Sequence, residues 1–495
     1  MIKMKNIKVL TSIAAKNIQR NKSKSRIIIL SIMIGTIAGT FISALMTGMY
    51  NQKVHDSIYT ECAHLQIVSK SYLSDEDINS TFSAQKAESV LKKYQNPGKN
   101  APIQAFSEQT IILSMAQTAR GNAGIKLTGI IPEEEKKVSD LYTKIIPGTG
   151  SYFSSKTSLP EVVIGDKLAE ILRIKNYRIT EKNLAEMLHN GLDKDIAAKL
   201  NSLKNIRYIT KKKLEKAIKA VTGQKVQGKA ISLIRKYSIY YGHMAKITFS
   251  FTNTAGELSF LSCRVGGIFK TSNTFFDQSE VFIRQQDLLK ETGLTANKIH
   301  KTKILLNKNL KPDNLKNIQP IEQEIQSSLP KLKVLDIRNT SPDAYSFQLM
   351  SLPSTFIILF IIYLVISFGI ANTMTMAVME RIKEFGMLRS IGMSKKEIRY
   401  MIMAESLILI AIGALIGIFI SVIIIIITSH TGINIFGSSS LESFGMNSLI
   451  YPSITPELFI IIVIMTGIVG IVTAISPINK VLKIKLTNAT KGVLS

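Results

Sequence analysis

The segment of this sequence that comes nearest to a chemical motif is Gly223-Gln-Lys-Val-Gln-Gly228-Lys229-Ala230. Up to its last position it follows the pattern of a phosphate-binding loop, in which backbone N–H groups and a Lys hold nucleotide phosphates. There Ala230 replaces the Ser or Thr whose hydroxyl holds Mg²⁺, and a Lys-rich helical pattern precedes the segment where a buried strand is required. We therefore expect no ATP site in this chain.

The two cysteines, Cys62 and Cys263, are too few for a disulfide framework. Each falls in a strand-like run, so a single bridge in an oxidising compartment is one interpretation and two separate buried thiols are the other. The sequence shows no HExxH motif, no zinc-ligand cluster and no nucleophile spaced to meet a base. It predicts no catalytic residue, no metal site and no cofactor site.

Residues 379–401 have the pattern of a docking element. Apolar residues recur there at helical intervals: Ile382, Phe385, Met387 or Leu388, Ile391 and Ile398. Charged residues occupy the other faces: Arg381, Lys383, Glu384 and Arg389. Gly386 and Gly392 are poor helix-interior residues, so they mark close packing or a break. An amphipathic helix-turn-helix suits a groove on a soluble partner and is longer than a connecting turn requires.

Four segments without Lys, Arg, Asp or Glu hold this element in place: residues 27–49, 356–378, 406–428 and 458–478. Each is long enough to cross the hydrocarbon core of a bilayer as a helix. The predicted fold class is an α-helical integral membrane protein with four transmembrane helices. Residues 50–352 form a large α+β extracytoplasmic, porter-like domain between helices one and two, because strand-type and helical patterns alternate there.

Lys and Arg beside the four segments predict the orientation, because positive loops stay in the cytoplasm. Residues 1–26 hold eight Lys and Arg and no acid, whereas 430–457 hold no Lys or Arg. The leader 1–26, the element 379–401 and the tail 479–495 are therefore predicted to be cytoplasmic, and 50–352 and 430–457 extracytoplasmic. Helical spacing of apolar residues within 1–26 predicts a helix lying in the membrane interface.

Composition limits the partners. A formal net charge of +27 would indicate nucleic acid in a soluble protein, but many of these charges flank the apolar segments, where orientation and anionic lipid explain them. We expect no nucleic-acid partner. Residues 175–241 hold sixteen Lys and Arg against five acids and read as a basic helical insertion. That insertion is either a surface for anionic head groups, cell wall or an acidic partner, or a solvated face.

Glycines four residues apart occur in two of the apolar segments: Gly35 and Gly39 in the first, Gly413 and Gly417 in the third. This spacing lets helix backbones approach closely in lipid, although glycine is common in membrane helices. The first pair is predicted to matter more, because a helix that relays motion needs a close, sliding contact.

The segment Asn372-Thr-Met-Thr-Met-Ala-Val-Met-Glu380-Arg381-Ile-Lys-Glu384-Phe-Gly386-Met-Leu388-Arg389-Ser-Ile-Gly392, followed by Glu405-Ser-Leu, resembles the core signature of FtsX-like permeases of ABC transporters. The leader 15–25, with Pro477 and the basic tail, resembles the ends of that family. Residues 162–170 and 265–269 resemble landmarks of its lipoprotein-releasing (Lol-type) and macrolide-export (MacB-type) branches. Residues 175–241 lie outside the resemblance.

The resemblance implies a half-transporter of the mechanotransmission type in the bacterial inner membrane. Two permeases, identical or paralogous, would bind a cytoplasmic ABC ATPase dimer through a coupling helix, and the partner would bind ATP and Mg. The implied coupling residues are Glu380, Arg381, Glu384, Phe385, Gly386, Leu388, Arg389, Gly392 and Glu405. The permease itself is then no enzyme.

The resemblance extends to more than one branch of the family and therefore leaves several substrates as alternatives. Release of lipoproteins to a periplasmic carrier is the leading hypothesis, with membrane lipid as a further partner. Export of a small molecule or peptide with an adaptor and outer-membrane channel is an alternative. Regulation of a cell-wall hydrolase is another.

Overall fold

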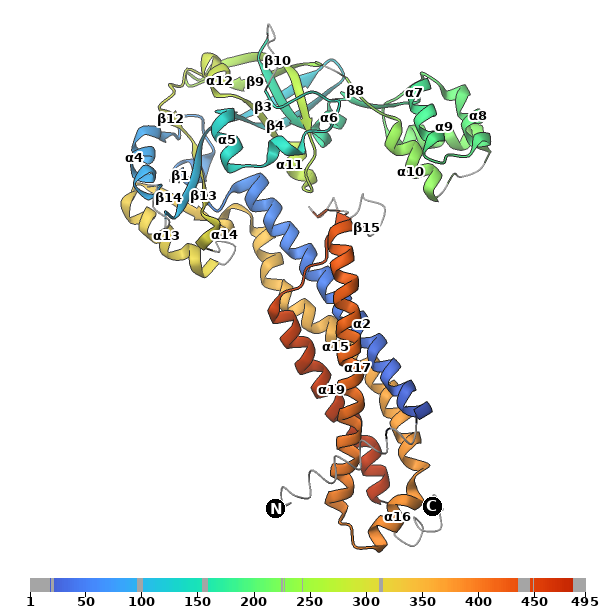
Figure 1. Ribbon diagram of the computed structural model, residues 1–495. Helices are drawn as coiled ribbons and strands as arrows, with labels where there is room; N and C mark the ends of the chain where they lie inside the picture. The colour runs from blue at the N-terminus through green and yellow to red at the C-terminus, as the bar shows by residue number, and fades with distance from the viewer. Residues whose placement is uncertain are drawn as a thin grey trace. The chain divides into compact units, whose positions relative to one another are not determined.

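The computed structural model describes residues 18, 22–95, 101–153, 159–223, 226, 228–242, 244–310, 315–434, 446–447 and 449–483. The chain divides into two units (Figure 1). The first consists of residues 1–53, 346–438 and 447–495, and the second of residues 54–345 and 439–446. The predicted interfacial helix of the leader, apart from Ile18 and residues 22–26, and the tail beyond Lys483 lie outside the described residues.

Long helices make up most of the first unit. They are α2 (Lys22–Asp56), α15 (Pro342–Met379), α17 (Lys395–Thr431) and α19 (Pro456–Lys483), with the short α16 (Ile382–Ser390) and the strand pair β15 (Ile433–Asn434) and β16 (Leu449–Ile450). By length and composition, all four long helices are able to cross a membrane. Each contains one predicted apolar segment, and α2, α15 and α17 extend well beyond theirs.

The two glycine pairs pack differently. A Cβ at Gly417 would lie 2.9 Å from the Met33 carbonyl oxygen, and one at Gly413 would lie 2.9 Å from the Ile29 carbonyl oxygen. A Cβ at Gly39 would instead meet the end of the Leu359 side chain at 3.3 Å. The close backbone approach therefore joins α17 to α2 through the third-segment pair, whereas Gly35 and Gly39 face side chains of α15.

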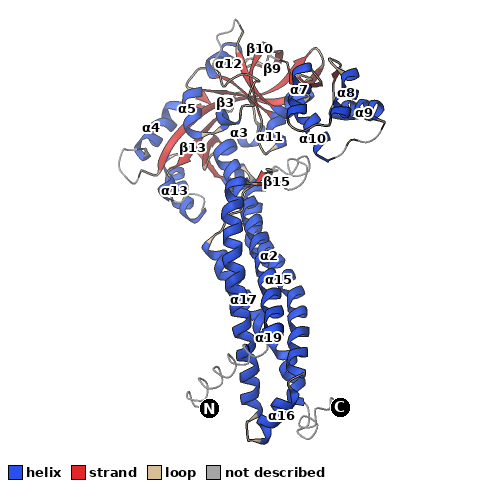
Figure 2. Cartoon of the chain, turned by 45° about the vertical axis from the view of Figure 1, so that its right-hand side comes forward, coloured by secondary structure: helices blue, strands red, loops and turns tan. Residues whose placement is uncertain are grey.

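The second unit is built on a nine-stranded mixed sheet in the order β14-β1-β13-β3-β4-β11-β5-β10-β9 (Figure 2). Its strands are β1 (Leu65–Ser69), β3 (Ile103–Thr118), β4 (Gly121–Ile130), β5 (Glu161–Gly165), β9 (Lys246–Thr252), β10 (Leu258–Phe269), β11 (Glu280–Arg284), β13 (Lys301–Leu306) and β14 (Leu332–Asp336). β9 also pairs back to β3, with Met115 opposite Ser250. Strands β3, β4, β11, β5, β10 and β9 thus close into a ring.

Helices and short strands cover this sheet. They are η1 (Ser57–Cys62, a π-helical turn), α3 (Tyr72–Asp75), β2 (Phe82–Ser83), α4 (Ala84–Tyr94), α5 (Pro132–Val138), η2 (Leu141–Lys144), α6 (Asp166–Ile171), α11 (Thr274–Ser279), α12 (Gln285–Thr292), β12 (Lys298–Ile299), η4 (Lys308–Leu310), α13 (Leu315–Ser328) and α14 (Ile337–Thr340). Apolar residues of α4 and α13, such as Leu91 and Ile325, pack on β1, β13 and β14. A second core, including Phe249 and Leu168, joins the ring strands to α6 and α12.

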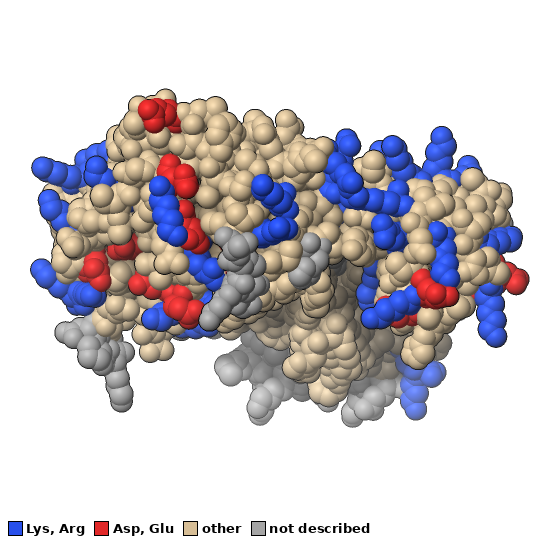
Figure 3. Space-filling model, turned by 90° about the horizontal axis from the view of Figure 1, so that it is seen from above, with Lys and Arg blue, Asp and Glu red and all other residues tan. Residues whose placement is uncertain are grey.

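Helices predominate in the basic insertion, as predicted, but it also contains a small three-stranded sheet that the sequence analysis did not predict. Its elements are β6 (Lys175–Arg178), α7 (Glu181–His189), α8 (Lys194–Leu200), η3 (Asn201–Leu203), β7 (Arg207–Tyr208), α9 (Lys211–Thr222), α10 (Gly228–Tyr237) and β8 (Ile239–Tyr241). The strands form a sheet in the order β7-β6-β8, and the insertion has its own apolar core. Lys and Arg side chains spread over it in Figure 3. Gly223 caps α9, while Gln224, Lys225 and Gln227 lie outside the described residues.

Both cysteines are free and buried, which corresponds to the interpretation of two separate thiols and not to a bridge. Cys62 ends η1, where its Sγ lies 3.0 Å from the Ser57 carbonyl oxygen. Cys263 lies on β10 within the core of the ring. Burial raises the pKa of Cys263 to about 12, so its reactive thiolate is scarce at neutral pH.

We expect both cysteines to resist maleimide in the folded protein and to react after denaturation without any reductant. Burial removes the thiols from the reagent, and thiolate formation is disfavoured in an apolar core. Intact mass before and after denaturation measures the number of labels. Labelling after denaturation that appears only when a reductant is added would show a disulfide and contradict this arrangement.

Candidate functional site

The candidate coupling segment, residues 379–401, runs from the end of α15 through α16 to the first turns of α17. Arg381 precedes α16, and Ser394 begins α17 with a capping box, in which the Glu397 backbone N–H donates to Ser394 Oγ and the Ser394 N–H donates to Glu397 at 2.8 Å. Gly392 has a φ of +105°, a conformation that side-chain-bearing residues rarely adopt. The predicted break at Gly392 is therefore the turn that separates α16 from α17.

Arg381 holds this segment to the helix that follows it. Its Nη1 donates to both carboxylate oxygens of Glu405 at 3.0 and 2.9 Å, and its Nε donates to Glu384 at 2.9 Å. The guanidinium also lies 5.3 Å from the centre of the Phe385 ring. Arg381 is 10% exposed and Glu405 14% exposed, so the pair is largely shielded from water. The guanidinium thus donates charge-assisted hydrogen bonds to two different carboxylates, from Nη1 to Glu405 and from Nε to Glu384, and these bonds set the position of α16 against α17.

Most of the apolar face of α16 is turned toward the chain itself. Phe385 is buried with Val378, Ile398 and Ala474 in a core to which α15, α17 and α19 also contribute. Ile382 and Gly386 are also buried, and Leu388 packs at the edge of this core. These residues position the segment and do not form its outer surface.

The outer surface of the segment carries two large apolar side chains. Ile391 is 85% exposed and Met387 is 56% exposed. They are four residues apart, so they lie on one side of α16 and its C-terminal turn. Lys383, one turn before Met387, is also exposed, and Arg389 is half-buried. The surface available for docking is thus smaller than the sequence pattern indicates and is centred on Met387 and Ile391.

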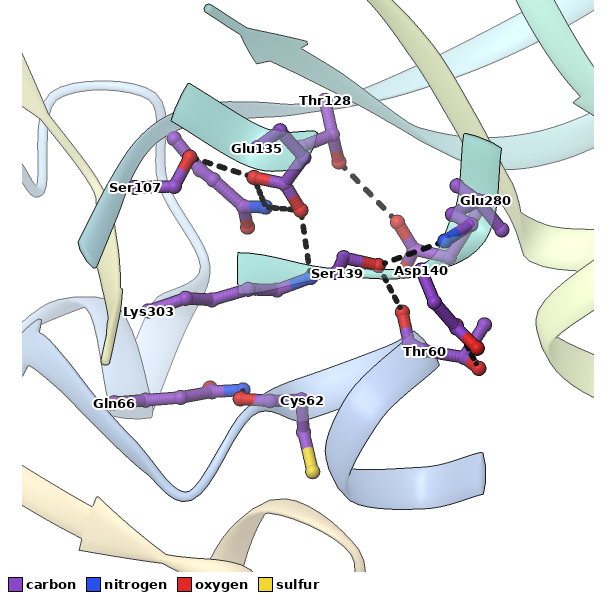
Figure 4. Close-up of polar contacts among 12 residues, drawn as sticks. Thr60, Cys62, Gln66, Ser107, Thr128, Glu135, Ser139, Asp140, Glu280 and Lys303 are labelled. Atoms are coloured by element: carbon purple, nitrogen blue, oxygen red, sulfur yellow. Dashed lines mark hydrogen bonds and ion pairs between the residues drawn. The ribbon is translucent and has the colours of Figure 1, made fainter. Parts of the chain in front are cut away.

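A second feature, which the sequence analysis missed, fastens the turn after α2 within the second unit (Figure 4). Thr60 of η1 donates from Oγ1 to Asp140 at 2.6 Å, and Ser139 Oγ donates to the Thr60 carbonyl oxygen at 2.9 Å. Asn273 donates to Glu61 at 3.0 Å, and Ser272 donates to Asp56 at 2.9 Å. These bonds tie η1 and the last residue of α2 to two loops that are far from them in the sequence.

The same region contains a buried ion pair (Figure 4). Glu135 and Lys303 have side chains 1% and 4% exposed, with 3.2 Å between Oε1 and Nζ. Ser107 and Gln109 also donate to this carboxylate, at 2.6 and 3.1 Å. Burial alone would raise the pKa of Glu135, but Lys303 and these donors together hold it below its ordinary value. The pair joins α5, β3 and β13, which places a rigid polar core beside η1.

Among the residues that the structure describes, no three His, Cys, Asp or Glu side chains come together as a metal site.

The predicted coupling residues divide into three groups by their positions in the structure. Arg381, Glu384 and Glu405 form one ion-pair network, Phe385, Gly386 and Leu388 belong to the inner face, and Glu380, Arg389 and Gly392 lie toward the surface or at the turn. Only the structure reveals which face of the amphipathic pattern is already occupied.

Comparison with known proteins shows what this segment is similar to. Residues 356–486 match the family model described as FtsX-like permease C-terminal, which confirms the resemblance found in the sequence. Over 126 residues, 26% of this chain, 33% are identical to the ABC transporter permease YtrF of Bacillus subtilis. Over 52 residues, 10% of the chain, 52% are identical to an uncharacterized ABC transporter permease of Methanocaldococcus jannaschii. The matches span 29% and 14% of the lengths of these relatives.

One solved structure aligns with part of this chain. It is the extracellular domain of the noncanonic ABC-type transporter YknZ from Gram-positive bacteria. The alignment covers 55% of this chain and 99% of that domain, with a TM-score of 0.26 and 11% sequence identity.

Proposed function

We propose that this chain, whose residues 356–486 match the model of the FtsX-like permease C-terminal family, is the permease subunit of an ABC transporter. Its four long apolar helices fit a membrane protein, and the candidate coupling segment lies within the matched residues. The proposed partner is a cytoplasmic ABC ATPase, which would bind and hydrolyse ATP while this chain performs no hydrolysis. A second copy or a paralogue would complete the transporter.

The observation that carries this proposal is the exposed pair Met387 and Ile391 on a segment that Arg381 holds in place. Large apolar side chains that protrude from a fixed helix are the usual anchors of a helix-in-groove contact. Burial of such anchors supplies most of the affinity, while charges around them set register and on-rate. Lys383 and Arg389 would supply those charges.

Movement of the ATPase would reach the second unit through the chain itself. α2 begins in the first unit, and its last turn belongs to the second, where η1 is hydrogen-bonded to Asp140 and Ser139. A helix fastened at its end by several bonds transmits displacement better than one that ends in a loose loop. We propose that α2 relays motion in this way, as mechanotransmission requires, with both termini and the coupling segment in the cytoplasm.

For the substrate we propose lipoproteins, released from the outer leaflet of the cytoplasmic membrane to a carrier. Support comes from the large α+β unit that continues directly from α2 and α15, which suits work on a substrate outside the membrane. Depletion of the protein should then leave lipoproteins in the cytoplasmic membrane, measured by proteomics of separated membranes. Normal lipoprotein distribution with impaired export of a small molecule would favour an exporter.

We expect Ile391→Glu and Met387→Glu to abolish stimulation of the ATPase partner while leaving unfolding temperature unchanged. Each places a charge where an apolar anchor would be buried on docking, but both side chains are exposed in the free chain. Co-purification and ATP turnover in detergent measure the effect. Leu258→Glu, at another exposed apolar residue on β10, is the matched control. Full stimulation in both segment variants would refute the docking surface.

A further inference from the structure

A cleft in the second unit gathers five cationic side chains with no acidic residue among its lining. It has a volume of about 280 Å³. We call it the arginine cleft and define it by the cations Arg120, Arg173, Arg178, Arg207 and Lys246, with Asn176 and Tyr240. Among the residues that the structure describes, none of the five cations forms a salt bridge. Such a concentration of unpaired charge is costly unless an anion is present.

One wall of the cleft is a face of the small sheet β7-β6-β8. Arg178 on β6 stands directly opposite Arg207 on β7, and Asn176 stands opposite Tyr240 on β8. The alternating residues, such as Tyr177, point to the other face and pack in the core of the insertion. Like charges directly opposite on neighbouring strands destabilise a sheet. The insertion therefore places two arginines together at a cost in stability.

Three buried polar atoms on this wall have no partner in the structure. They are Arg178 Nε, Arg207 Nε and Asn176 Oδ1. Asn176 is 3% exposed. Arg207 uses Nη2 to bond the Arg173 carbonyl oxygen at 3.1 Å, and Arg178 lies 5.3 Å from the Tyr240 ring centre. Both guanidinium groups are thus oriented by contacts that leave Nε donors unused, and unused buried donors call for an acceptor.

The opposite wall is firmly attached. Arg120 lies in the turn between β3 and β4, where Thr118 Oγ1 donates to the Leu172 carbonyl oxygen at 2.9 Å. Asp166 on α6 binds Lys175 Nζ at 2.7 Å and accepts from Tyr241 Oη at 2.7 Å. These bonds join the first and last strands of the insertion to the ring, so both walls keep a fixed spacing. A preformed site of this kind binds with little loss of conformational entropy.

We propose that the arginine cleft binds a small ligand that carries a phosphate group. A phosphate offers several acceptor oxygens and up to two negative charges, which suits paired guanidinium groups better than a single carboxylate does. A hydroxyl on the ligand would supply the donor that Asn176 Oδ1 lacks. The volume admits a phosphate with a short polyol and not a large nucleotide. The source is either the head group of an anionic lipid or a free phosphate ester.

The test is calorimetric titration of the full chain in phosphatidylcholine nanodiscs at constant ionic strength. The probes are inorganic phosphate, glycerol 3-phosphate and a monomeric short-chain phosphatidylglycerol. We expect saturable binding of glycerol 3-phosphate, weakened about tenfold or more in the Arg178→Gln/Arg207→Gln variant, since each charge-assisted bond contributes about one such factor. Lys212→Gln/Lys213→Gln, at exposed residues of α9 outside the cleft, removes the same charge and should bind as the native chain does.

The outcomes separate the two sources. Tighter binding of the short-chain lipid than of glycerol 3-phosphate identifies a head group, and equal or weaker binding identifies a free ester. Arg120→Gln, in an exposed turn of the other wall, should also weaken binding and provides a variant that does not alter the small sheet. Failure of all three probes to bind, or equal affinity in the native chain and both cleft variants, would overturn the proposal.

Discussion

Arg381→Leu should lower the free energy of unfolding by about 3–5 kcal/mol and abolish coupling to the proposed ATPase partner. The substitution leaves Glu405, which is 14% exposed, without the guanidinium that donates to both of its oxygens. An uncompensated buried charge is far more costly than the loss of the pair as a whole. Unfolding of the detergent-solubilised protein, followed by heat or denaturant, measures the loss.

Two further variants distinguish the effect of breaking the ion pair from the effect of removing one positive charge. Arg399→Leu removes an exposed arginine from the same region of α17 and should change stability little. Arg381→Leu combined with Glu405→Leu should recover much of the loss, because replacing both partners by apolar residues is often close to neutral. If Arg381→Leu unfolds as the native chain does, Arg381 is not what holds α16 in place.

Gly417→Leu should destabilise the helical unit by on the order of 3 kcal/mol, because overpacking cannot be relieved by side-chain movement there. A Cβ at this position would lie 2.9 Å from both the Met33 carbonyl oxygen and Thr36 Cβ. Since the Met33 oxygen belongs to the backbone, α2 and α17 must separate. Gly39→Leu should cost less, since the nearest neighbour is the flexible end of Leu359.

The matched control for this prediction is Gly467→Leu on α19, where a Cβ would have no neighbour within 4 Å. Expression level and unfolding temperature in detergent report the packing, and ATPase stimulation reports coupling. Equal tolerance of Gly417→Leu and Gly467→Leu would show that the α2–α17 approach is not close. A greater loss in Gly39→Leu would restore the order expected from the sequence.

The long helices were predictable because each depends on a local signal. Charge-free runs of this length have few alternatives, and α2, α15, α17 and α19 contain the four predicted segments. The boundaries of the insertion were also predictable, since β6 begins at Lys175 and β8 ends at Tyr241. Its small sheet was not, because β7 has only two residues and pairs with a strand about thirty positions away.

The candidate site was predictable in position but not in orientation. The periodic apolar residues from Ile382 to Ile398 mark an amphipathic helix, but the pattern cannot distinguish a groove on a partner from Ala474 of the chain's own α19. The glycine pairs pose the same problem, because identical spacing in two helices does not indicate which pair meets a backbone. Both answers depend on which helices are neighbours, and a single sequence does not contain that information locally.

The insertion leaves and rejoins the ring at one point. Lys175 pairs with Tyr241, and the Gly242 N–H donates to the Ile174 carbonyl oxygen at 3.0 Å. The ends of the insertion therefore lie together as the ends of a short hairpin would. The entropic cost of closing this connection rises only slowly with the length of the insertion. With its own apolar core and a single hairpin-like attachment, the segment 175–241 is a self-contained cassette whose length hardly affects the fold that carries it.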